Sequence, residues 1–203
     1  PCNKREPGTG CSARDGLNRI HAILGHSPEC IAVHPSDMCV AMAALEAMVI
    51  VQGAGGERRI PFADFHRLPG DTPELDNNLE DGELITALEL PAQSFADHSA
   101  YLKVRDRASY AFALVSVAAA LEMKDGTIQA ARIALGGVAH KPWRKPAAEA
   151  LLTNQPAMPE SFEKAADVLL EGASGFNDNA FKIELARRSI VRALSEAAAG
   201  DAQ

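Results

Sequence analysis

The sequence lacks several features that would point directly to a function. It has no apolar run of about eighteen residues, the length a helix needs to cross a membrane. Basic residues are outnumbered, with 20 Lys and Arg against 27 Asp and Glu, and the formal net charge of -7 argues against broad nucleic-acid binding. No G-x-S-x-G, phosphate-loop or H-E-x-x-H motif occurs. An apolar content of 47% nevertheless predicts an ordinary globular protein of one large domain or two small ones.

Cysteine is absent after residue 39, and all four cysteines lie within the first 39 residues. The segment 1–11 contains two prolines and two glycines and has no apolar face, so it fits neither a helix nor a strand. Cys2 and Cys11 are separated by eight residues, and Cys30 follows after eighteen more. A polar loop of this kind needs something other than a core to hold it. A metal or cluster bound through thiolates would serve, and so would a disulfide.

The spacing of these cysteines bears on which group holds the loop. Disulfide frameworks spread their cysteines through a small secreted chain, whereas these are crowded at one end. Structural zinc sites favour C-x2-4-C pairs, and the wider gaps here fit an iron–sulfur cluster with scattered ligands better. Cys39 lies among small apolar residues and is interpreted as a packed core thiol. Cys2, Cys11 and Cys30 are therefore the candidate ligands, and a fourth would have to lie before residue 1.

The pattern of the rest of the chain predicts an α+β protein, an antiparallel sheet with helices packed on one side. Ser36 or Asp37 is expected to cap a helix over 38–47, because their side chains accept free amides at a helix start. Other helices are predicted at 16–24, 62–65, 146–152, 159–170 and 179–198. Strands are predicted at 30–33, 48–51, 58–61, 84–91, 99–105, 112–123 and 127–138, with a hairpin turn at 124–126. Residues 92–98 are interpreted as a linker between two lobes.

Charge is concentrated at Lys103–Arg107, beside strongly apolar predicted strands. One interpretation is a surface turn with internal ion pairs. The other is a polar rim facing an anionic or electron-rich ligand, with Lys103 placing positive charge on it. Composition alone leaves both open. His21 and His26 are interpreted as surface or locally hydrogen-bonded histidines.

Four blocks occur in a fixed order along the chain: Ala-Val-His-Pro-Ser-Asp at 32–37, Gly-Glu-Leu-Ile at 82–85 with a proline at 91, Tyr-Leu-Lys-Val-Arg-Asp-Arg at 101–107, and Ala-Leu-Gly-Gly-Val-Ala-His-Lys-Pro-Trp-Arg at 134–144. Together they resemble the FAD-binding (medium) subunit of the xanthine dehydrogenase family of molybdenum hydroxylases. The cysteine loop is similar to that of a subgroup carrying an extra [4Fe-4S] cluster, as in periplasmic aldehyde oxidoreductases. The resemblance makes Cys2, Cys11 and Cys30 cluster ligands.

The resemblance also implies a domain organisation. Residues 1–94 would be the second part of a PCMH-type FAD-binding domain, with the iron–sulfur insertion loop at about 1–33. Residues 95–203 would be a CO dehydrogenase flavoprotein-like C-terminal domain, an antiparallel sheet with helices. The family's glycine-rich FAD-pyrophosphate loop lies in an N-terminal lobe that this sequence does not contain. We therefore expect the native protein to be longer than this chain.

By resemblance, the function is electron transfer in a molybdenum-dependent aldehyde oxidoreductase. FAD would pass electrons to an external acceptor, the partners being a small [2Fe-2S] subunit and a large molybdenum-cofactor subunit that carries out the hydroxylation. Asp37 matches the aspartate that hydrogen-bonds FAD, Ile85 an apolar residue packing on the flavin, and Lys103 the lysine near the isoalloxazine ring. Neither a nucleic-acid partner nor a membrane span is expected. The expected location is the periplasm, reached with a partner's signal, or the cytoplasm.

Two other functions compete with this reading. The first is a non-enzymatic α+β interaction domain whose cysteine loop holds structural zinc or a disulfide. The second is an NAD-linked or soluble-acceptor dehydrogenase module, for which the sequence carries no dinucleotide fingerprint.

Overall fold

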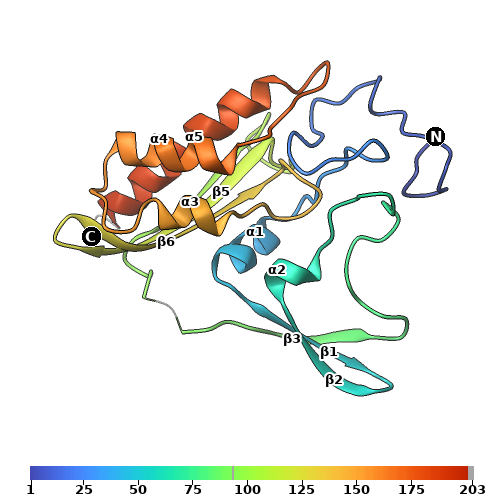
Figure 1. Cartoon of the computed structure of the whole chain (residues 1–203), viewed down its shortest axis with the longest axis horizontal. Coiled ribbons are helices and arrows are strands. Elements are labelled where there is room, and N and C mark those ends of the chain that lie inside the picture. The colour runs from blue at the N-terminus through green and yellow to red at the C-terminus, as the bar shows by residue number, and fades with distance from the viewer. Residues whose placement is uncertain (93, 201–203) are drawn as a thin grey trace.

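The structure is a computed structural model that describes residues 1–92 and 94–200. Two three-stranded antiparallel sheets are present, with helices arranged around them (Figure 1). One sheet has the order β2-β1-β3, made of β1 (Met48–Gly53), β2 (Gly56–Pro61) and β3 (Leu84–Glu89). The other has the order β4-β5-β6, made of β4 (Ser99–Val104), β5 (Val115–Lys124) and β6 (Thr127–Gly136). The helices are α1 (Asp37–Ala44), α2 (Phe62–Phe65), α3 (Pro146–Ala150), α4 (Pro159–Leu169) and α5 (Phe181–Ala199). The predicted α+β class is confirmed.

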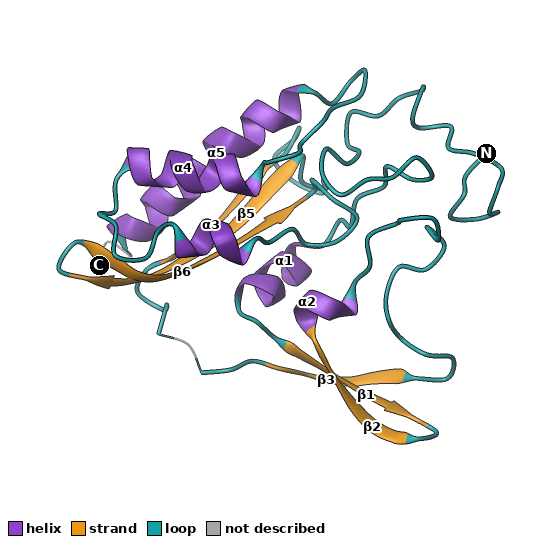
Figure 2. Ribbon diagram, in the orientation of Figure 1, coloured by secondary structure: helices purple, strands orange, loops and turns teal. Residues whose placement is uncertain are grey.

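The main core lies between the β4-β5-β6 sheet and helices α3, α4 and α5 (Figure 2). Alternate residues of β5 face this core, because successive side chains of a strand point to opposite faces. These are Val115, Val117, Ala119 and Leu121, and they pack with Ile190, Leu194 and other residues of α5. The last helix therefore covers the length of the sheet on this face.

The opposite face of the same sheet is also covered, which the prediction of helices on one side did not include. Ala118 of β5 and Ala134 of β6 pack against Val40 of α1 in a second core. A Cβ added at Gly136 would lie only 2.5 Å from the Val40 side chain, so a glycine is needed for α1 to approach this closely. Because both faces of β5 are buried, residues 115–121 are all buried and, apart from Ser116, all apolar, with no alternation.

Local sequence signals explain where several elements begin and end. The Ser36 side chain accepts a hydrogen bond from the Cys39 amide at 3.2 Å and caps α1. Asp125 and Gly126 turn the β5–β6 hairpin with positive φ angles of 50° and 74°. Proline occupies the first turn of both α3 and α4, where its missing amide costs nothing. The observed strands at 84–89 and 99–104 agree with the predictions.

The first lobe exposes its edge strand. All six residues of β3 are exposed, including Leu84, Ile85 and Leu88. The strand predicted at 84–91 is present over 84–89, and neither of its faces is covered within residues 1–92 and 94–200. No helix in the described part of the chain has the length and apolarity to cross a bilayer.

The first 35 residues form no helix or strand in the structure, and two predictions there are wrong. The segment 16–24 is not helical, because the fully buried Asn18 amide donates to the carbonyls of Ala13, Arg14 and Gly16 and holds a turn instead. Residues 30–33 form no strand, since no neighbouring strand runs alongside them to pair with. Residue 93 of the predicted linker and residues 201–203 of the predicted second domain lie outside the described residues.

Candidate functional site

The first candidate site lies where α1 meets β4. Asp37, the first residue of α1, accepts hydrogen bonds from Lys103 Nζ at 2.7 Å and from the Tyr101 hydroxyl at 2.9 Å. Burial raises the pKa of Tyr101 above its usual value, Ser116 opposes this and Asp37 adds to it, so the hydroxyl stays a donor. Two of the sequence-predicted residues, 66 positions apart, are thus in direct contact.

A cavity of about 580 Å³ opens in front of this ion pair. Its lining includes Pro35, Asp37, Lys103 and Arg107, together with Tyr110 and Phe112. These two aromatic rings are 96% and 67% exposed, which is a large apolar area to leave in water. A smaller recess at its base is lined by Ser116, Gly136 and Gly137. The arrangement combines a cation, a hydrogen-bond acceptor and flat aromatic surfaces.

Ile85 is not part of this lining. It lies on β3, in the other sheet, and its side chain is 44% exposed. The structure therefore brings together Asp37 and Lys103 but not the third predicted flavin residue. A planar ring stacked on Tyr110 or Phe112 near Lys103 fits the cavity. These residues suit the ring-binding part of an FAD site, and its pyrophosphate-binding part has no counterpart among them.

The second candidate site is the cysteine loop. Cys2 and Cys11 lie on adjacent antiparallel segments joined by a β-bridge. The buried Asn3 side chain ties the loop to residue 29, donating to the Glu29 carboxylate at 2.7 Å and to its carbonyl at 3.0 Å, and accepts from the Gly10 amide at 2.7 Å. The loop is therefore held by polar contacts, as its composition requires.

Cys30 lies in the same neighbourhood and is buried. Burial raises the pKa of its thiol, the Ala32 amide and Lys4 lower it, and the nearby Cys11 and Cys2 raise it further. All four cysteines are within the described residues and all are free thiols, so the structure contains no disulfide in the loop. Three thiols gathered by a polar loop, one of them desolvated, fit a thiolate-bound cluster, which requires deprotonated ligands and supplies the charge partner they lack.

The loop is attached to the C-terminal lobe by a residue that sequence analysis missed. Lys182 of α5 is fully buried and donates its ammonium to the carbonyls of His21, Gly137 and Ile20, at 2.7, 2.5 and 3.3 Å. Burial lowers the pKa of Lys182 to about 7. The side-chain amide of Asn179 also donates hydrogen bonds to the carbonyls of His21 and Ala22, both at 3.2 Å. The sequence signal that could have indicated this buried lysine is its place among the apolar positions of an amphipathic helix.

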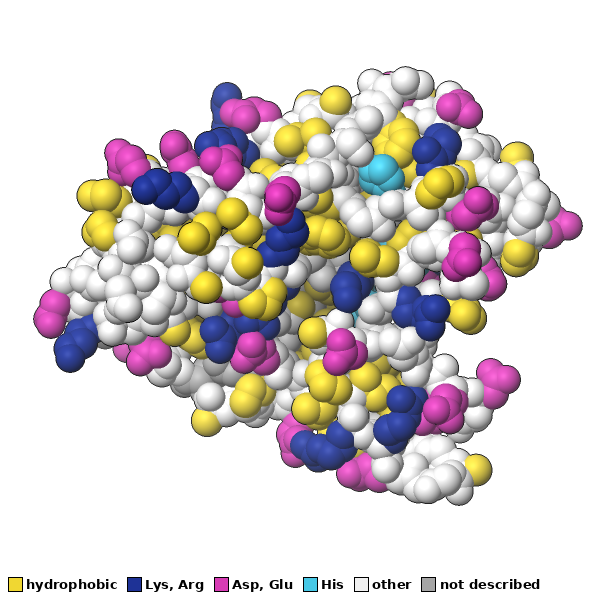
Figure 3. Space-filling model, viewed as in Figure 1, with side chains coloured by type: hydrophobic (Ala, Val, Ile, Leu, Met, Phe, Trp, Pro, Cys, Tyr) yellow, Lys and Arg dark blue, Asp and Glu magenta, His cyan; other side chains and the backbone are white. Residues whose placement is uncertain are grey.

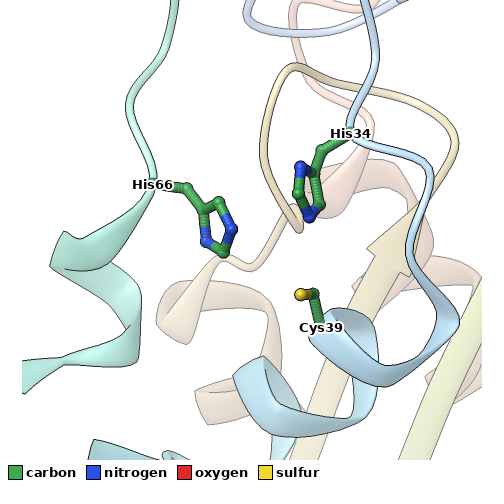
Figure 4. A group of neighbouring side chains, drawn as sticks. All are labelled: His34, Cys39 and His66. Atoms are coloured by element: carbon green, nitrogen blue, oxygen red, sulfur yellow. The ribbon is translucent and has the colours of Figure 1, made fainter. Parts of the chain in front are cut away.

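A third group of side chains was also missed. His34, Cys39 and His66 each offer a ligand atom, and these atoms all lie within 4.8 Å of one another (Figure 4). His34 precedes α1, Cys39 is in its first turn, and His66 follows α2. Burial, with the neighbouring His34 as the next cause, lowers the pKa of His66 to about 4. Cys39 is half-buried beside the second core, yet its thiol also faces the two imidazole rings (Figure 4).

Charged side chains of both signs are interspersed over the face of the molecule in Figure 3. The predicted cluster at Lys103–Arg107 is not internally paired in the way a self-contained surface turn would be. Lys103 pairs with Asp37, and Asp106 pairs with Arg19 of the cysteine loop segment at 2.8 Å. The cluster thus joins three parts of the chain.

Comparison with known families divides the chain in two. Residues 23–93 match the FAD binding domain in molybdopterin dehydrogenase, and residues 100–197 match the CO dehydrogenase flavoprotein C-terminal domain. The chain is 49% identical to the aldehyde oxidoreductase FAD-binding subunit PaoB of Escherichia coli (strain K12) over 200 residues, which is 98% of this chain and 59% of PaoB. It is 39% identical over 109 residues to the glyceraldehyde dehydrogenase medium chain of Sulfolobus acidocaldarius, covering 54% of this chain and 36% of that one.

Solved structures show the same fold. Quinoline 2-oxidoreductase from Pseudomonas putida 86 superposes with a TM-score of 0.69 at 26% identity, covering 91% of this chain and 60% of that one. Carbon monoxide dehydrogenase from Hydrogenophaga pseudoflava gives 0.69 at 27% identity, covering 80% and 59%. The chain thus spans less than two thirds of the proteins it matches. It belongs to the family of FAD-binding subunits of the molybdenum hydroxylases.

Proposed function

We propose that this chain is the FAD- and [4Fe-4S]-binding electron-transfer part of a molybdenum-dependent aldehyde oxidoreductase. It would receive electrons from a small [2Fe-2S] subunit and a large molybdenum subunit and pass them to an external acceptor. The 49% identity to an aldehyde oxidoreductase FAD-binding subunit supports the aldehyde class of substrate. The location that goes with this proposal is the periplasm, entered with a partner's signal, or the cytoplasm.

The observation that carries the proposal is the cavity in which Lys103 and Asp37 meet beside two exposed aromatic rings. FAD, when bound, supplies one-electron acceptance and two-electron release. Lys103 would place a positive charge where reduction builds negative charge on the ring system, and this favours the reduced state. Asp37 holds the lysine ammonium in position at 2.7 Å and is itself oriented by Tyr101.

The hydrogen bonds that order the cysteine loop support the cluster half of the proposal. Asn3 fixes Cys2 relative to Glu29, one residue before Cys30, so the loop's two ends are held together before any group binds. A set of three thiolates leaves one position of a four-ligand cluster to a ligand other than these cysteines. The non-enzymatic alternative predicts structural zinc or a disulfide in the same loop, and it is tested by the same measurement.

The first test is the ultraviolet–visible spectrum of the full-length protein purified without oxygen, with iron and flavin counted chemically. Bands of oxidised flavin over a broad thiolate–iron shoulder, both bleached by dithionite, are the expected result. A colourless protein that contains zinc and no iron would contradict the proposal and favour a structural loop.

Lys103→Ala tests the flavin half of the proposal. The flavin midpoint potential should fall, or the flavin content should drop, while circular dichroism stays unchanged. Lys124→Ala, in the exposed β5–β6 hairpin, is the matched control and should leave both values at wild-type levels. An unchanged potential and an unchanged flavin content in Lys103→Ala would show that this lysine does not face the flavin.

Cys11→Ser tests the cluster half. Iron content should fall while most of the flavin remains, because the thiol loop and the Lys103 cavity are built from different residues. Ser12→Ala, next to it and exposed, is the control. Wild-type iron in Cys11→Ser would remove this cysteine from the ligand set.

A further inference from the structure

His34, Cys39 and His66 are brought together from two parts of the chain, the start of α1 and the residue that follows α2. The His34 and His66 rings lie with centroids 4.4 Å apart and planes inclined at 56°, and Cys39 projects from α1 toward the gap between them (Figure 4). One ring nitrogen of each histidine and the Cys39 sulfur all lie within 4.8 Å of one another. Among the described residues this is the one grouping of three metal-ligating side chains at such short mutual distances.

Both histidines carry a ring nitrogen that nothing in the described chain satisfies. His34 Nε2 and His66 Nδ1 are buried and have no hydrogen-bond partner. The His66 side chain as a whole is more than nine-tenths buried, between the rings of Phe62 and Phe65. A buried polar atom without a partner is energetically unfavourable, because it has lost its hydrogen bonds to water. Two such histidines beside a thiol indicate a site for a ligand that accepts nitrogen and sulfur donors.

We propose that His34, Cys39 and His66 form a transition-metal site that binds a zinc-class divalent ion through two imidazole nitrogens and one thiolate. Two nitrogens and one sulfur are a ligand set that zinc accepts, with bonds of about 2.0–2.3 Å. The ligand atoms already lie within 4.8 Å of one another, so small side-chain rotations would bring them onto one ion. The thiol proton is released to solvent on binding, because the thiolate is the ligand.

The surroundings say what kind of site this is. Three protein ligands leave a fourth tetrahedral position for water or another small ligand. His66 also lines a cavity of about 90 Å³ with Phe62, Lys141 and Trp143, which gives a path from the surface to the ring. Lys4 and Lys141 lie near the two histidines, whereas Asp76 brings the opposite charge. The negative charge of the Cys39 thiolate would therefore offset part of the positive charge of the bound ion and of the two lysines.

This site is separate from both groups of the proposed function. It uses none of Cys2, Cys11 and Cys30, and none of its three residues lines the cavity in front of Lys103. It would hold zinc rather than iron, so the two assignments fail independently. Its ligands would also link α1 to the residue that follows α2. These two helices otherwise meet through apolar side chains of the second core.

The test is metal binding by the full-length protein after removal of loosely bound ions. One zinc per chain, counted by mass spectrometry in addition to any iron, is the expected result. Cobalt(II) should replace it and give ligand-field bands in the red, beyond the absorption of flavin, and X-ray absorption at the zinc edge should report nitrogen and one sulfur neighbour. Cys39→Ala and His66→Phe should each weaken zinc binding at least about tenfold, since even outer-shell changes cost 10–100-fold.

Two controls keep the result specific. Cys11→Ser removes a thiol from the loop and His26→Gln removes a half-buried histidine bonded to Ser174, and both should keep the zinc and the red cobalt bands. His66→Phe suits an environment already built from Phe62 and Phe65, so its fold is checked by circular dichroism. Zinc absent from the loaded wild type, or zinc unchanged in both Cys39→Ala and His66→Phe, would overturn the proposal. Zinc lost only in Cys11→Ser would assign it to the cysteine loop and overturn the proposal as well.

Discussion

The β4-β5-β6 lobe and the first 33 residues are stabilised in opposite ways. In the lobe, side chains such as Leu121, Ile133 and Leu194 are completely removed from water, and apolar burial is the dominant favourable contribution. In the N-terminal loop, regular elements are missing and the order comes from side chains that bond to backbone groups, such as Asn3 and Asn18. The lobe carries its own core. The N-terminal loop contributes Ile23 and Leu24 to that core and otherwise depends on polar partners and on the group that its thiols bind.

The contact between the two regions is partly apolar, through Ile23 and Leu24 in the main core, and partly polar and buried. Lys182 and Asn179 extend from the core lobe to the carbonyls of Ile20, His21 and Ala22. The comparison teaches that a helix with an apolar face can also serve as the support of an irregular loop. The loop's geometry then depends on a helix about 160 positions away in the sequence.

The largest expected effect is a cavity in the lobe. Leu121→Ala should lower the free energy of unfolding by about 3–4 kcal/mol, because the side chain is fully buried in a close-packed core. Leu151→Ala, at a 48% exposed position, should change it by less than about 0.5 kcal/mol. Urea denaturation measures both. Equal losses in the two variants would mean that the core does not dominate stability.

The second effect breaks the connection between the regions. Lys182→Met should cost about 3 kcal/mol, because three carbonyls lose their buried donor. It should also lower the iron content, which Leu121→Ala should not do as long as the protein is folded. Lys164→Met, exposed on α4, is the matched control. If Lys182→Met kept both stability and iron, the buried ammonium would have no supporting role.

The third effect is a pH dependence of the free energy of unfolding that Lys182 causes. The pKa of Lys182 is lowered from 10.5 to about 7 in the folded protein, so between these values the unfolded chain binds a proton that the folded chain does not. Stability contributed by Lys182 should therefore rise with pH from about 7 upward, by at most about 1.4 kcal/mol per pH unit. Urea titrations at several pH values should show the wild type gaining on Lys182→Met as pH rises. A constant difference would contradict the lowered pKa.

The smallest effect on global stability should come from the loop. Asn3→Ala removes bonds to Gly10 and Glu29, yet global unfolding should change by less than about 1 kcal/mol, because the core lobe sets it. Iron content and resistance of residues 1–30 to proteolysis should fall clearly. A large loss in urea stability with intact iron would reverse the comparison between the two regions.

The sequence predicted those parts of the fold whose causes are local. The Asp-Gly turn, the Ser36 cap and the prolines that begin α3 and α4 act within a few residues of themselves, and the elements they define are where they were expected. Segment 16–24 was predicted as helix from its local pattern. It is a turn because its carbonyls are taken by Asn18, Asn179 and Lys182, two of which lie more than 150 residues away.

The candidate sites divide in the same way. Asp37 and Lys103 were predicted through resemblance, and the structure adds that they contact each other, which their separation of 66 residues does not reveal. Cys39 was interpreted as a core thiol from its neighbours on the helix. The approach of His66 depends on how α2 packs against α1, a long-range contact with no signal in the pattern of either segment.

The double-sided burial of β5 has a consequence for how the molecule can move. By sequence, α1 belongs to the first matched family region, but it packs on strands of the second, through Val40 against Ala118 and Ala134. Arg144 of the second region strengthens this contact with an ion pair to Glu46 at 2.8 Å, and Glu149 of its own region holds its guanidinium at 2.6 Å. Cutting the chain between β3 and β4 would therefore leave two fragments that stay associated. The boundary between the two matched family regions therefore separates two sequence families, and we do not expect the chain to bend there as at a hinge.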